Sequence, residues 1–419
     1  MTKTPVQHGP GVLSFYLNIE LSESWVIFKT YAVDDGSSSM SLFTINMRKY
    51  REIMEKKALI LLFSAFFGFV WKAECQYLKP SFDKYEYMEA LKISARSTGD
   101  SSYFNTIEKP QNFEMVYQSG VLGLDNQWDL WKHSEKPVAA ISIRGTTPNA
   151  VSWLENFYAA MVPAKGSLTL ADDFEFKYAL SENPQAAVHI GWLIGSGFIV
   201  RDLLPKIDSA YQQGTKEFLI IGHSQGGGIA YLLTAHLRAL QKSGNLPADL
   251  KIKTYCSAAP KPGNLYFAYT YEDLAYDGWA YNVVNAKDWV PEVPMSIQTT
   301  ADFNTINPFL NAEAMIRKEK FPKRLIMKSV YNQLDKPTKK ARRNYQKYLG
   351  KMTSKSVVKN IPGYVAPPFY DSNHYVRTGD IIVLSPDDAY MEEFPDNPKV
   401  LFPHHFHAPY LMLTSQLPE

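Results

Sequence analysis

The pattern of apolar and polar residues changes its period several times between residues 85 and 417. Short apolar runs bounded by turn residues predict strands, and longer segments with apolar residues every three or four positions predict helices. Strand-like runs at 112–118, 127–132 and 138–144 predict an antiparallel start of a sheet. Further strands are predicted at 217–221, 252–257, 281–285 and 375–384, and helices at 85–96, 188–211, 229–240, 265–274 and 408–417. This alternation predicts an α/β fold, a wound mixed sheet covered by helices.

Residues 300–360 interrupt the alternation with a strongly basic segment of helix-forming composition. Between Glu313 and Lys359 there are fifteen Lys or Arg residues and only three acidic residues, although the net charge of the whole chain is +2. Apolar residues recur among these charges at a spacing that predicts amphipathic helices, with breaks at Pro322 and Pro337. This insertion, placed before the last strands, is either a solvated helical cover over the sheet or a surface that docks on anionic lipid.

Composition excludes several classes of protein. The chain has 419 residues, of which 45% are hydrophobic and 21% charged, so a large core is feasible and global disorder is not expected. A net charge of +2 gives no global case for nucleic-acid binding. No phosphate-binding GxxxxGK motif and no CxxC zinc pattern occurs. With only two cysteines, Cys75 and Cys256, disulfides do not hold the fold together.

The most apolar run of the chain, residues 58–71, lies near the N-terminus behind several Lys and Arg residues. Fourteen residues are too few to span a bilayer comfortably, and Ala73-Glu74-Cys75 follows with small residues at its first and third positions. This order predicts a secretory signal peptide at 54–75, a mature domain at 76–419, and a secreted or extracytoplasmic protein, with the periplasm included. The alternatives are a buried core helix and lipid attachment at Cys75.

The predicted signal peptide does not begin at residue 1. We therefore expect translation to start at Met47 or Met54, so that residues 1–53 are either a non-native extension or disordered.

A serine flanked by glycines joins a predicted strand to a predicted helix. Ser224 lies between Gly222 and Gly226, after strand 217–221 and before helix 229–240. A sharp strand-to-helix turn around such a serine is the nucleophile-elbow pattern. Side chains at Gly222 and Gly226 would clash where strand and helix pass closely, which explains the glycines. The alternative is a tight structural turn without chemistry.

A serine nucleophile needs a base to take its proton and an acid to orient that base, which follow in the order acid then histidine in elbow folds. Asp288 comes just after the buried-looking strand 281–285, in a loop stiffened by prolines, and is the predicted acid. Asp273 and Asp277 are the alternatives, although they more often cap or solvate a turn.

The predicted base is His407, followed by Tyr410, in a proline-bounded loop before the last helix. His404 and His405 in the same loop are alternatives, whereas His374 begins a strand, where a polar surface role is more usual. Three close histidines also suit a metal, but no acidic or cysteine ligand lies beside them in the sequence.

Acyl transfer also needs two backbone N–H donors for the developing oxyanion. The N–H of Gln225, directly after the nucleophile, is one. Thr146 follows the strand that ends near Arg144, and Gly145 lets the backbone approach closely, so Thr146 is the predicted second donor. The alternative is an ordinary turn.

Taken together, these residues resemble the class 3 lipase family, typified by fungal triacylglycerol lipases. The resemblance covers residues 110–295 and 375–410, and its motifs are Ile143-Arg144-Gly145-Thr146, Trp153-Leu154-Glu155-Asn156, Val188-His189-Ile190-Gly191-Trp192, the elbow, Ala259-Pro260-Lys261-Pro262-Gly263-Asn264, Val283-Val284-Asn285 with Asp288 and Val290-Pro291, Tyr375-Val376-Arg377-Thr378-Gly379-Asp380, and His407-Ala408-Pro409-Tyr410.

The resemblance implies an α/β-hydrolase fold, a triad of Ser224, Asp288 and His407, and an oxyanion hole at Thr146 and Gln225. It also implies ester hydrolysis without a cofactor and a short lid at 148–158. The chain departs from the family in three ways: Gln225 stands where Leu is frequent, the usual stabilising cysteines are missing, and the interval from acid to histidine is long.

These features predict a secreted serine carboxylic-ester hydrolase, a lipase that acts on acylglycerol esters. Its expected partners are an ester or lipid substrate and a transient lipid interface, with no nucleic acid. The competing hypothesis is a secreted lipid- or surface-binding protein with a vestigial elbow.

Overall fold

The structure, a computed structural model, describes residues 14–21, 25–34, 37–46 and 76–418, with side chains from residue 76 onward. These residues belong to two compact units, Met1–Cys75 and Gln76–Glu419. The predicted signal peptide at 54–75 lies outside the described residues, so it stays a prediction. None of the helices in the described part of the chain combines the length and the apolarity needed to span a bilayer.

The first unit contains a three-stranded antiparallel sheet of β1 (Ser14–Leu21), β2 (Trp25–Asp34) and β3 (Ser37–Asn46), in that spatial order. Strands are thus present in the segment for which the sequence predicts a non-native extension or disorder. The reason is visible in β1, where Leu17, Ile19 and Leu21 alternate with polar residues at the period of a strand.

A seven-stranded sheet forms the centre of the second unit. Five strands pair in parallel, and two more follow at one edge, each antiparallel to its neighbour, which confirms the predicted mixed sheet and its antiparallel start. The spatial order is β16 (Asp380–Leu384), β14 (Ala280–Asn285), β12 (Lys251–Ser257), β11 (Glu217–His223), β6 (Val138–Ile143), β5 (Trp128–His133) and β4 (Phe113–Gln118).

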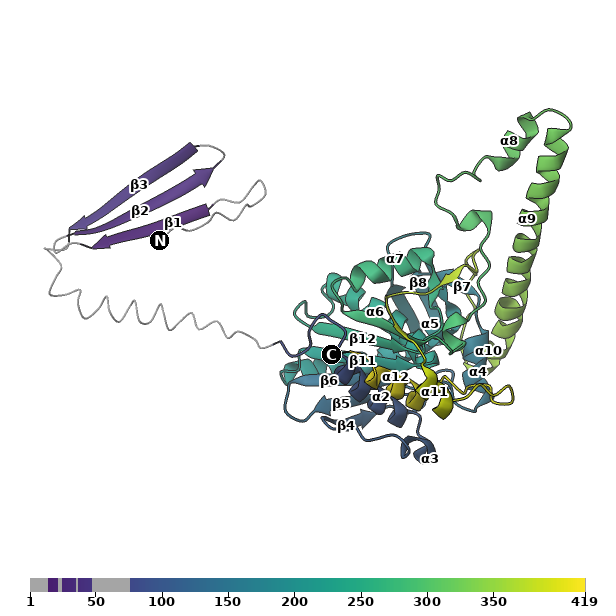
Figure 1. The fold of residues 1–419 in the computed structure, drawn as a ribbon, viewed down its shortest axis with the longest axis horizontal. Coiled ribbons are helices and arrows are strands. Elements are labelled where there is room, and N and C mark those ends of the chain that lie inside the picture. The colour runs from purple at the N-terminus through teal and green to yellow at the C-terminus, as the bar shows by residue number, and fades with distance from the viewer. Residues whose placement is uncertain (1–13, 22–24, 35–36, 47–75, 419) are drawn as a thin grey trace. The chain divides into compact units, whose positions relative to one another are not determined.

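Helices cover both faces of this sheet (Figure 1). On one face lie α5 (Ile190–Gln212), α6 (Gln225–Lys242) and α7 (Leu265–Leu274); on the other lie α2 (Lys84–Ser97) and α12 (His407–Ser415). The central strand β11 serves both cores, since Phe218 and Ile220 pack with the first group and Leu219 and Ile221 with the second. A strand buried on both faces needs a continuous apolar run, as this one has.

Several short elements differ from the predicted ones. Residues 375–384 are not one strand: β15 (Tyr375–Val376) and β16 join different sheets, and Gly379 between them has φ +85°. The helix predicted at 188–211 begins only at Ile190, because the residues before it form a strand, β10 (Ala187–His189). A small sheet of β15, β13 (Gly263–Asn264), β10 and β7 (Met161–Pro163), and a hairpin of β8 (Lys165–Ala171) and β9 (Phe174–Ala179), were not predicted.

The basic insertion is helical, as predicted, and consists of α8 (Ala312–Lys318), α9 (Lys323–Gln346), a π-helical turn (Lys347–Met352) and α10 (Thr353–Asn360). Pro322 directly precedes α9, but Pro337 lies inside it, so the predicted break at Pro337 is wrong. An internal proline removes one hydrogen bond, and the 24-residue helix continues through it. In Figure 1, α8 and much of α9 stand away from the central sheet rather than covering it.

The junction of β11 and α6 leaves no room for a side chain at Gly222, where a Cβ atom would lie 2.1 Å from the carbonyl oxygen of Gly226. We expect Gly222→Ala to lower the free energy of unfolding by about 1–3 kcal/mol or more, because the backbone cannot yield without moving α6. Urea unfolding would measure this.

The matched control is Gly120→Ala, where nothing lies within 4 Å of the added Cβ atom. Equal stability of both variants would contradict the close passage of strand and helix.

Candidate active site

Ser224 sits at the turn between β11 and α6 with φ +59° and ψ −129°, a backbone conformation that is strained for a residue with a side chain. The turn is held by the N–H of Ser224, which donates to the carbonyl of Ser257 at 3.0 Å. A Cβ atom at Gly226 would lie 2.3 Å from the carbonyl oxygen of Ile143, so the end of β6 passes directly beside the turn. The local geometry is that of a nucleophile elbow.

Asp288, three residues beyond the end of β14, is buried and accepts three hydrogen bonds. Its Oδ1 accepts from the N–H of Val290 at 3.0 Å, and its Oδ2 accepts from Nδ1 of His405 and from the hydroxyl of Tyr410, both at 2.8 Å. The acid thus lies after a strand, as predicted, but its histidine partner is His405. The predicted pairing of Asp288 with His407 is corrected by this geometry.

His407 points elsewhere. It is the first residue of α12, and its Nδ1 lies 2.7 Å from the hydroxyl of Tyr103 while its Nε2 lies 3.1 Å from Oγ of Ser94. Burial lowers the pKa of His407 to about 3, so the ring is neutral near pH 7. Both ring nitrogens contact side chains near the start of the domain. His407 therefore links α12 to that region and has a structural role.

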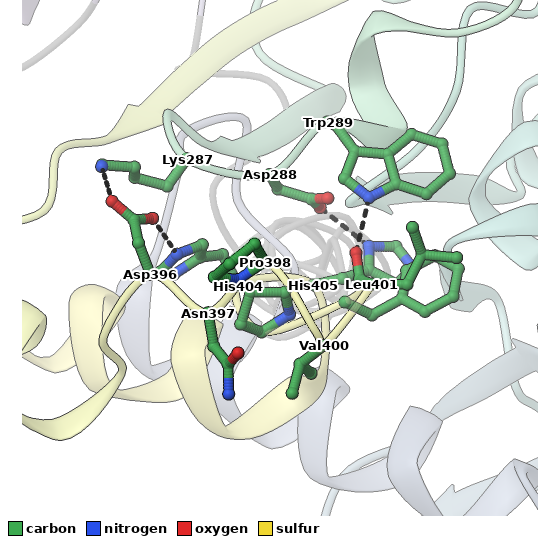
Figure 2. Close-up of a pocket in the computed structure, with 12 residues that line it drawn as sticks. Lys287, Asp288, Trp289, Asp396, Asn397, Pro398, Val400, Leu401, His404 and His405 are labelled. Carbon is green, nitrogen blue, oxygen red and sulfur yellow. Dashed lines mark hydrogen bonds and ion pairs between the residues drawn. The ribbon is translucent and has the colours of Figure 1, made fainter.

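The loop of residues 396–405, which carries His405, is tied down by a polar chain (Figure 2). Lys287 Nζ lies 2.7 Å from one carboxylate oxygen of Asp396, and Nε2 of His404 lies 2.9 Å from the other. The hydrogen bond from Lys287, followed by that from His404, lowers the pKa of Asp396. Further along the loop, the indole N–H of Trp289 donates to the carbonyl of Leu401 at 2.8 Å. These contacts fix the loop against the residues that flank Asp288.

A pocket of about 320 Å³ lies beside the Asp288–His405 pair. It is lined by Lys287, Asp288, Trp289, Asp396, Asn397, Pro398, Val400, Leu401, Phe402, Pro403, His404 and His405.

His223, next to the serine, links the elbow to the same loop. Its Nε2–H donates to the carbonyl of His405 at 2.7 Å, and its Nδ1 accepts from the hydroxyl of Ser257 at 3.0 Å. Because the Ser257 hydroxyl is used as a donor here, its oxygen accepts from the hydroxyl of Tyr87, 2.6 Å away. Burial lowers the pKa of His223 well below its ordinary value. A neutral His223 thus holds the backbone of His405 against the elbow.

Thr146 lies at the end of β6 within a network of side-chain amides. Its hydroxyl donates to Oε1 of Gln225 at 2.9 Å, and Nδ2 of Asn156 donates both to Thr146 Oγ1 at 2.9 Å and to Gln225 Oε1 at 2.7 Å. Trp192 in turn donates its indole N–H to Oδ1 of Asn156 at 3.0 Å. The side chain of Gln225, the residue directly after the serine, therefore binds the Thr146 hydroxyl. An apolar residue at this position could not form this hydrogen bond.

No catalytic or binding role is predicted from the sequence for Asn156, Trp192 or His189, although all three lie in motifs that carry the family resemblance. The ring of His189 stacks on Trp192 with 3.7 Å between centroids, and its Nε2 donates to the carbonyl of Asn156 at 3.2 Å. The neighbouring Glu155 is fully buried, which raises the pKa of its carboxyl well above the ordinary value, and its Oε2 accepts from Asn126. Trp192 and His189 thus hold Asn156 in place, and Asn156 in turn donates to the Thr146 hydroxyl.

The segment 148–158, expected as a lid, contains α4 (Ala150–Phe157). Trp153 on this helix stacks with Phe157 and approaches Phe402 of the 396–405 loop, with 6.4 Å between centroids. Phe402 also stacks on Trp289 at 5.3 Å. Aromatic rings from three segments therefore surround the approach to His405.

The three histidines at 404–407 do not converge on one point: His404 faces Asp396 and Tyr390, His405 faces Asp288, and His407 faces Tyr103 and Ser94. Within residues 76–418, whose side chains the structure describes, no group of three or more His, Cys, Asp or Glu side chains is placed to hold a metal ion.

Residues 140–297 match the family model of lipase (class 3), which confirms the resemblance over that segment. The matched segment contains Thr146, Ser224 and Asp288 but ends before the histidines of the 404–407 loop. Only the geometry therefore distinguishes between those histidines.

Among solved structures, the chain is similar to a fungal lipase–inhibitor complex, with 20% identity, coverage of 51% of this chain and 75% of that one, and a TM-score of 0.39. It is also similar to lipase II of Rhizopus niveus (22% identity, 51% and 75% coverage, TM-score 0.37) and to the Lip2 lipase of Yarrowia lipolytica (18% identity, 52% and 77% coverage, TM-score 0.39). No curated protein matches the chain significantly in sequence.

The buried, neutral ring of His407 makes the stability of the fold depend on pH. Its pKa is about 3 in the folded chain and about 6.5 when unfolded, so the unfolded state binds more protons between these values. We expect the free energy of unfolding to fall as the pH drops below about 6.5, and His407→Asn to make this fall shallower. Urea unfolding between pH 8 and pH 4 would measure both slopes.

The control is His133→Asn, whose partly exposed side chain should remove less of the slope. A His407→Asn slope identical to that of the unmodified protein would show that folding does not lower the pKa of His407.

Proposed function

We propose that this chain, whose residues 140–297 match the family model of lipase (class 3), is a serine carboxylic-ester hydrolase that acts on acylglycerol esters. The observation that carries the proposal is the buried Asp288–His405 pair, held against the strained Ser224 turn by the hydrogen bond from His223 to the His405 carbonyl. Nucleophile, base and acid are the parts that acyl transfer requires.

In the proposed mechanism, His405 is the general base. Its Nδ1 donates to Asp288, so in the neutral ring Nε2 is the acceptor. Ser224 Oγ forms a bond to the ester carbonyl carbon while its proton passes to Nε2 of His405. The tetrahedral intermediate then expels the alcohol, which takes this proton, and leaves an acyl-serine. A water molecule, deprotonated by His405, releases the fatty acid and restores the serine.

Asp288 stabilises the imidazolium that forms during each step, and Tyr410 keeps the carboxylate in position. The Tyr410 hydroxyl donates to the same Oδ2 that accepts from His405, while it accepts from the N–H of Asn285 at 3.0 Å. A carboxylate fixed by three donors has little freedom to turn away from the histidine, which supports its role as the orienting acid.

The oxyanion hole in this proposal uses the backbone N–H groups of Gln225 and Thr146. Gln225 begins α6, and the first N–H groups of a helix have no partner within it and favour negative charge. The Thr146 hydroxyl is engaged with Gln225 and Asn156, which fixes the turn that presents the Thr146 N–H. The aromatic side chains of Trp153, Trp289 and Phe402 supply an apolar surface for an acyl chain near the base.

Removal of the nucleophile tests the proposal directly. We expect Ser224→Ala to lower the turnover of a short-chain chromogenic ester by about 10⁶-fold, the loss typical of a triad nucleophile. Circular dichroism would verify that the variant is folded. More than a few per cent of residual activity would show that another group attacks the ester. The binding-protein alternative instead predicts no activity even in the unmodified chain.

A pair of histidine variants tests which ring is the base. We expect His405→Ala to match Ser224→Ala, because members of a triad act as a unit. His407→Asn should keep the turnover within about tenfold at temperatures where it is folded, since neither nitrogen of His407 faces Asp288. Measured with the same ester, an inactive His407→Asn beside an active His405→Ala would restore the original sequence-based choice.

A further inference from the structure

The first half of the basic insertion carries a row of apolar side chains that the domain does not cover. On α9, Ile326, Val330 and Leu334 are 62%, 54% and 69% exposed. Residues four positions apart lie on one side of a helix, so these three form a continuous apolar line. Phe321, just before the start of the helix, is also exposed, at 75%.

The apolar line is accompanied by cations. Residues 306–334, here called the arm, contain six Lys or Arg residues and two acidic ones. Both acidic residues are already paired, Glu313 with Arg317 and Glu319 with Lys323. Within the described part of the chain, the other four cations have no acidic partner: Lys318, Lys320, Arg324 and Lys328. The arm thus carries both exposed apolar residues and uncompensated positive charge.

The contacts of α9 with the domain lie in its second half, which forms the base of the arm. Buried residues of α9 are confined to its second half, Asp335, Arg342 and Tyr345. Arg342 lies 2.7 Å from Asp371, and Gln346 donates to the carbonyl of Tyr370 at 2.7 Å. Beyond this base the insertion extends away from the sheet, with α8 packed along α9 (Figure 1). Packing against the domain therefore explains the second half of α9 but not the apolar line of the first.

We propose that the arm is an interfacial anchor that inserts its apolar line into the headgroup region of an anionic phospholipid surface. A helix of low overall hydrophobicity that carries exposed aliphatic residues on one side and Lys and Arg on the rest of its surface has the properties of helices that lie in such interfaces. The uncompensated cations select a negatively charged surface, and this attraction weakens with salt. The purpose of the anchor is to hold the active site near its lipid substrate. Only this purpose, and not the binding itself, rests on the proposed function.

The test uses full-length Ser224→Ala, so that no lipid is hydrolysed, and co-sedimentation with vesicles of phosphatidylcholine alone or with 30% phosphatidylglycerol. We expect at least tenfold tighter binding to the anionic vesicles at low salt, and loss of most of this difference at high salt. Replacement of Ile326, Val330 and Leu334 by Gln, or of Lys320, Arg324 and Lys328 by Gln, should each weaken binding at least tenfold.

Matched controls change exposed residues outside the arm: Val121→Gln with Tyr276→Gln for the apolar set, and Lys109, Lys136 and Lys251 to Gln for the cations. These should bind as Ser224→Ala does. Equal binding to both vesicle types, no binding to either, or unchanged binding of either arm variant would overturn the proposal. A self-association that the apolar substitutions abolish, without vesicle binding, would assign the line to a second copy of the chain instead.

The same arm substitutions in the chain with Ser224 intact separate the anchor from the chemistry. Hydrolysis of a soluble short-chain ester should be unchanged, because the arm contains none of the proposed catalytic residues. Vesicle binding without any ester hydrolysis by the unmodified chain would refute the proposed function and leave the anchor standing. Hydrolysis without vesicle binding would refute the anchor and leave the proposed function standing.

Discussion

The close passage of backbone around Ser224 is the constraint on which the rest of the site depends. Gly226 lies against the carbonyl of Ile143 and Gly222 against the carbonyl of Gly226, so β6, β11 and α6 meet with no side chain between them. This contact brings the end of β6, which carries Thr146, beside the serine. It also sets the start of α6, which begins with the N–H of Gln225, at the same point. Two adjacent strands and one helix thereby define the site before any polar side chain is placed.

Other contacts place His405 at this point. The parallel pairing of β16 with β14 returns the chain beside Asp288 after the long insertion, and the 396–405 loop is then tied by Lys287, Trp289 and His223. A long interval between acid and base is tolerated because the insertion leaves the domain through the irregular residues 303–311, returns through α9 and α10, and ends before β16. Loop length costs little when both ends are fixed by the sheet.

Two kinds of histidine thus share one small region. His223 and His407 stack with 4.3 Å between ring centroids, and burial lowers the pKa of both. They act as neutral hydrogen-bonding groups that join the elbow, α12 and α2. His405 differs because its Nδ1 meets a carboxylate, the one partner that stabilises a charged imidazolium during proton transfer.

The sequence by itself determined the elbow, the acid and the strand that carries Thr146, because each is a local pattern: a strand, a turn that needs glycine or follows a strand end, and a helix. It also determined the mixed sheet, since period and order along the chain are local properties as well. It did not determine which histidine meets Asp288. His404, His405 and His407 lie within four residues and have identical chemistry, and only the packing of the loop and of α12 decides where each ring points. The split of β15 from β16, the continuation of α9 through Pro337 and the projection of the arm were likewise decided by tertiary contacts, which no local pattern records.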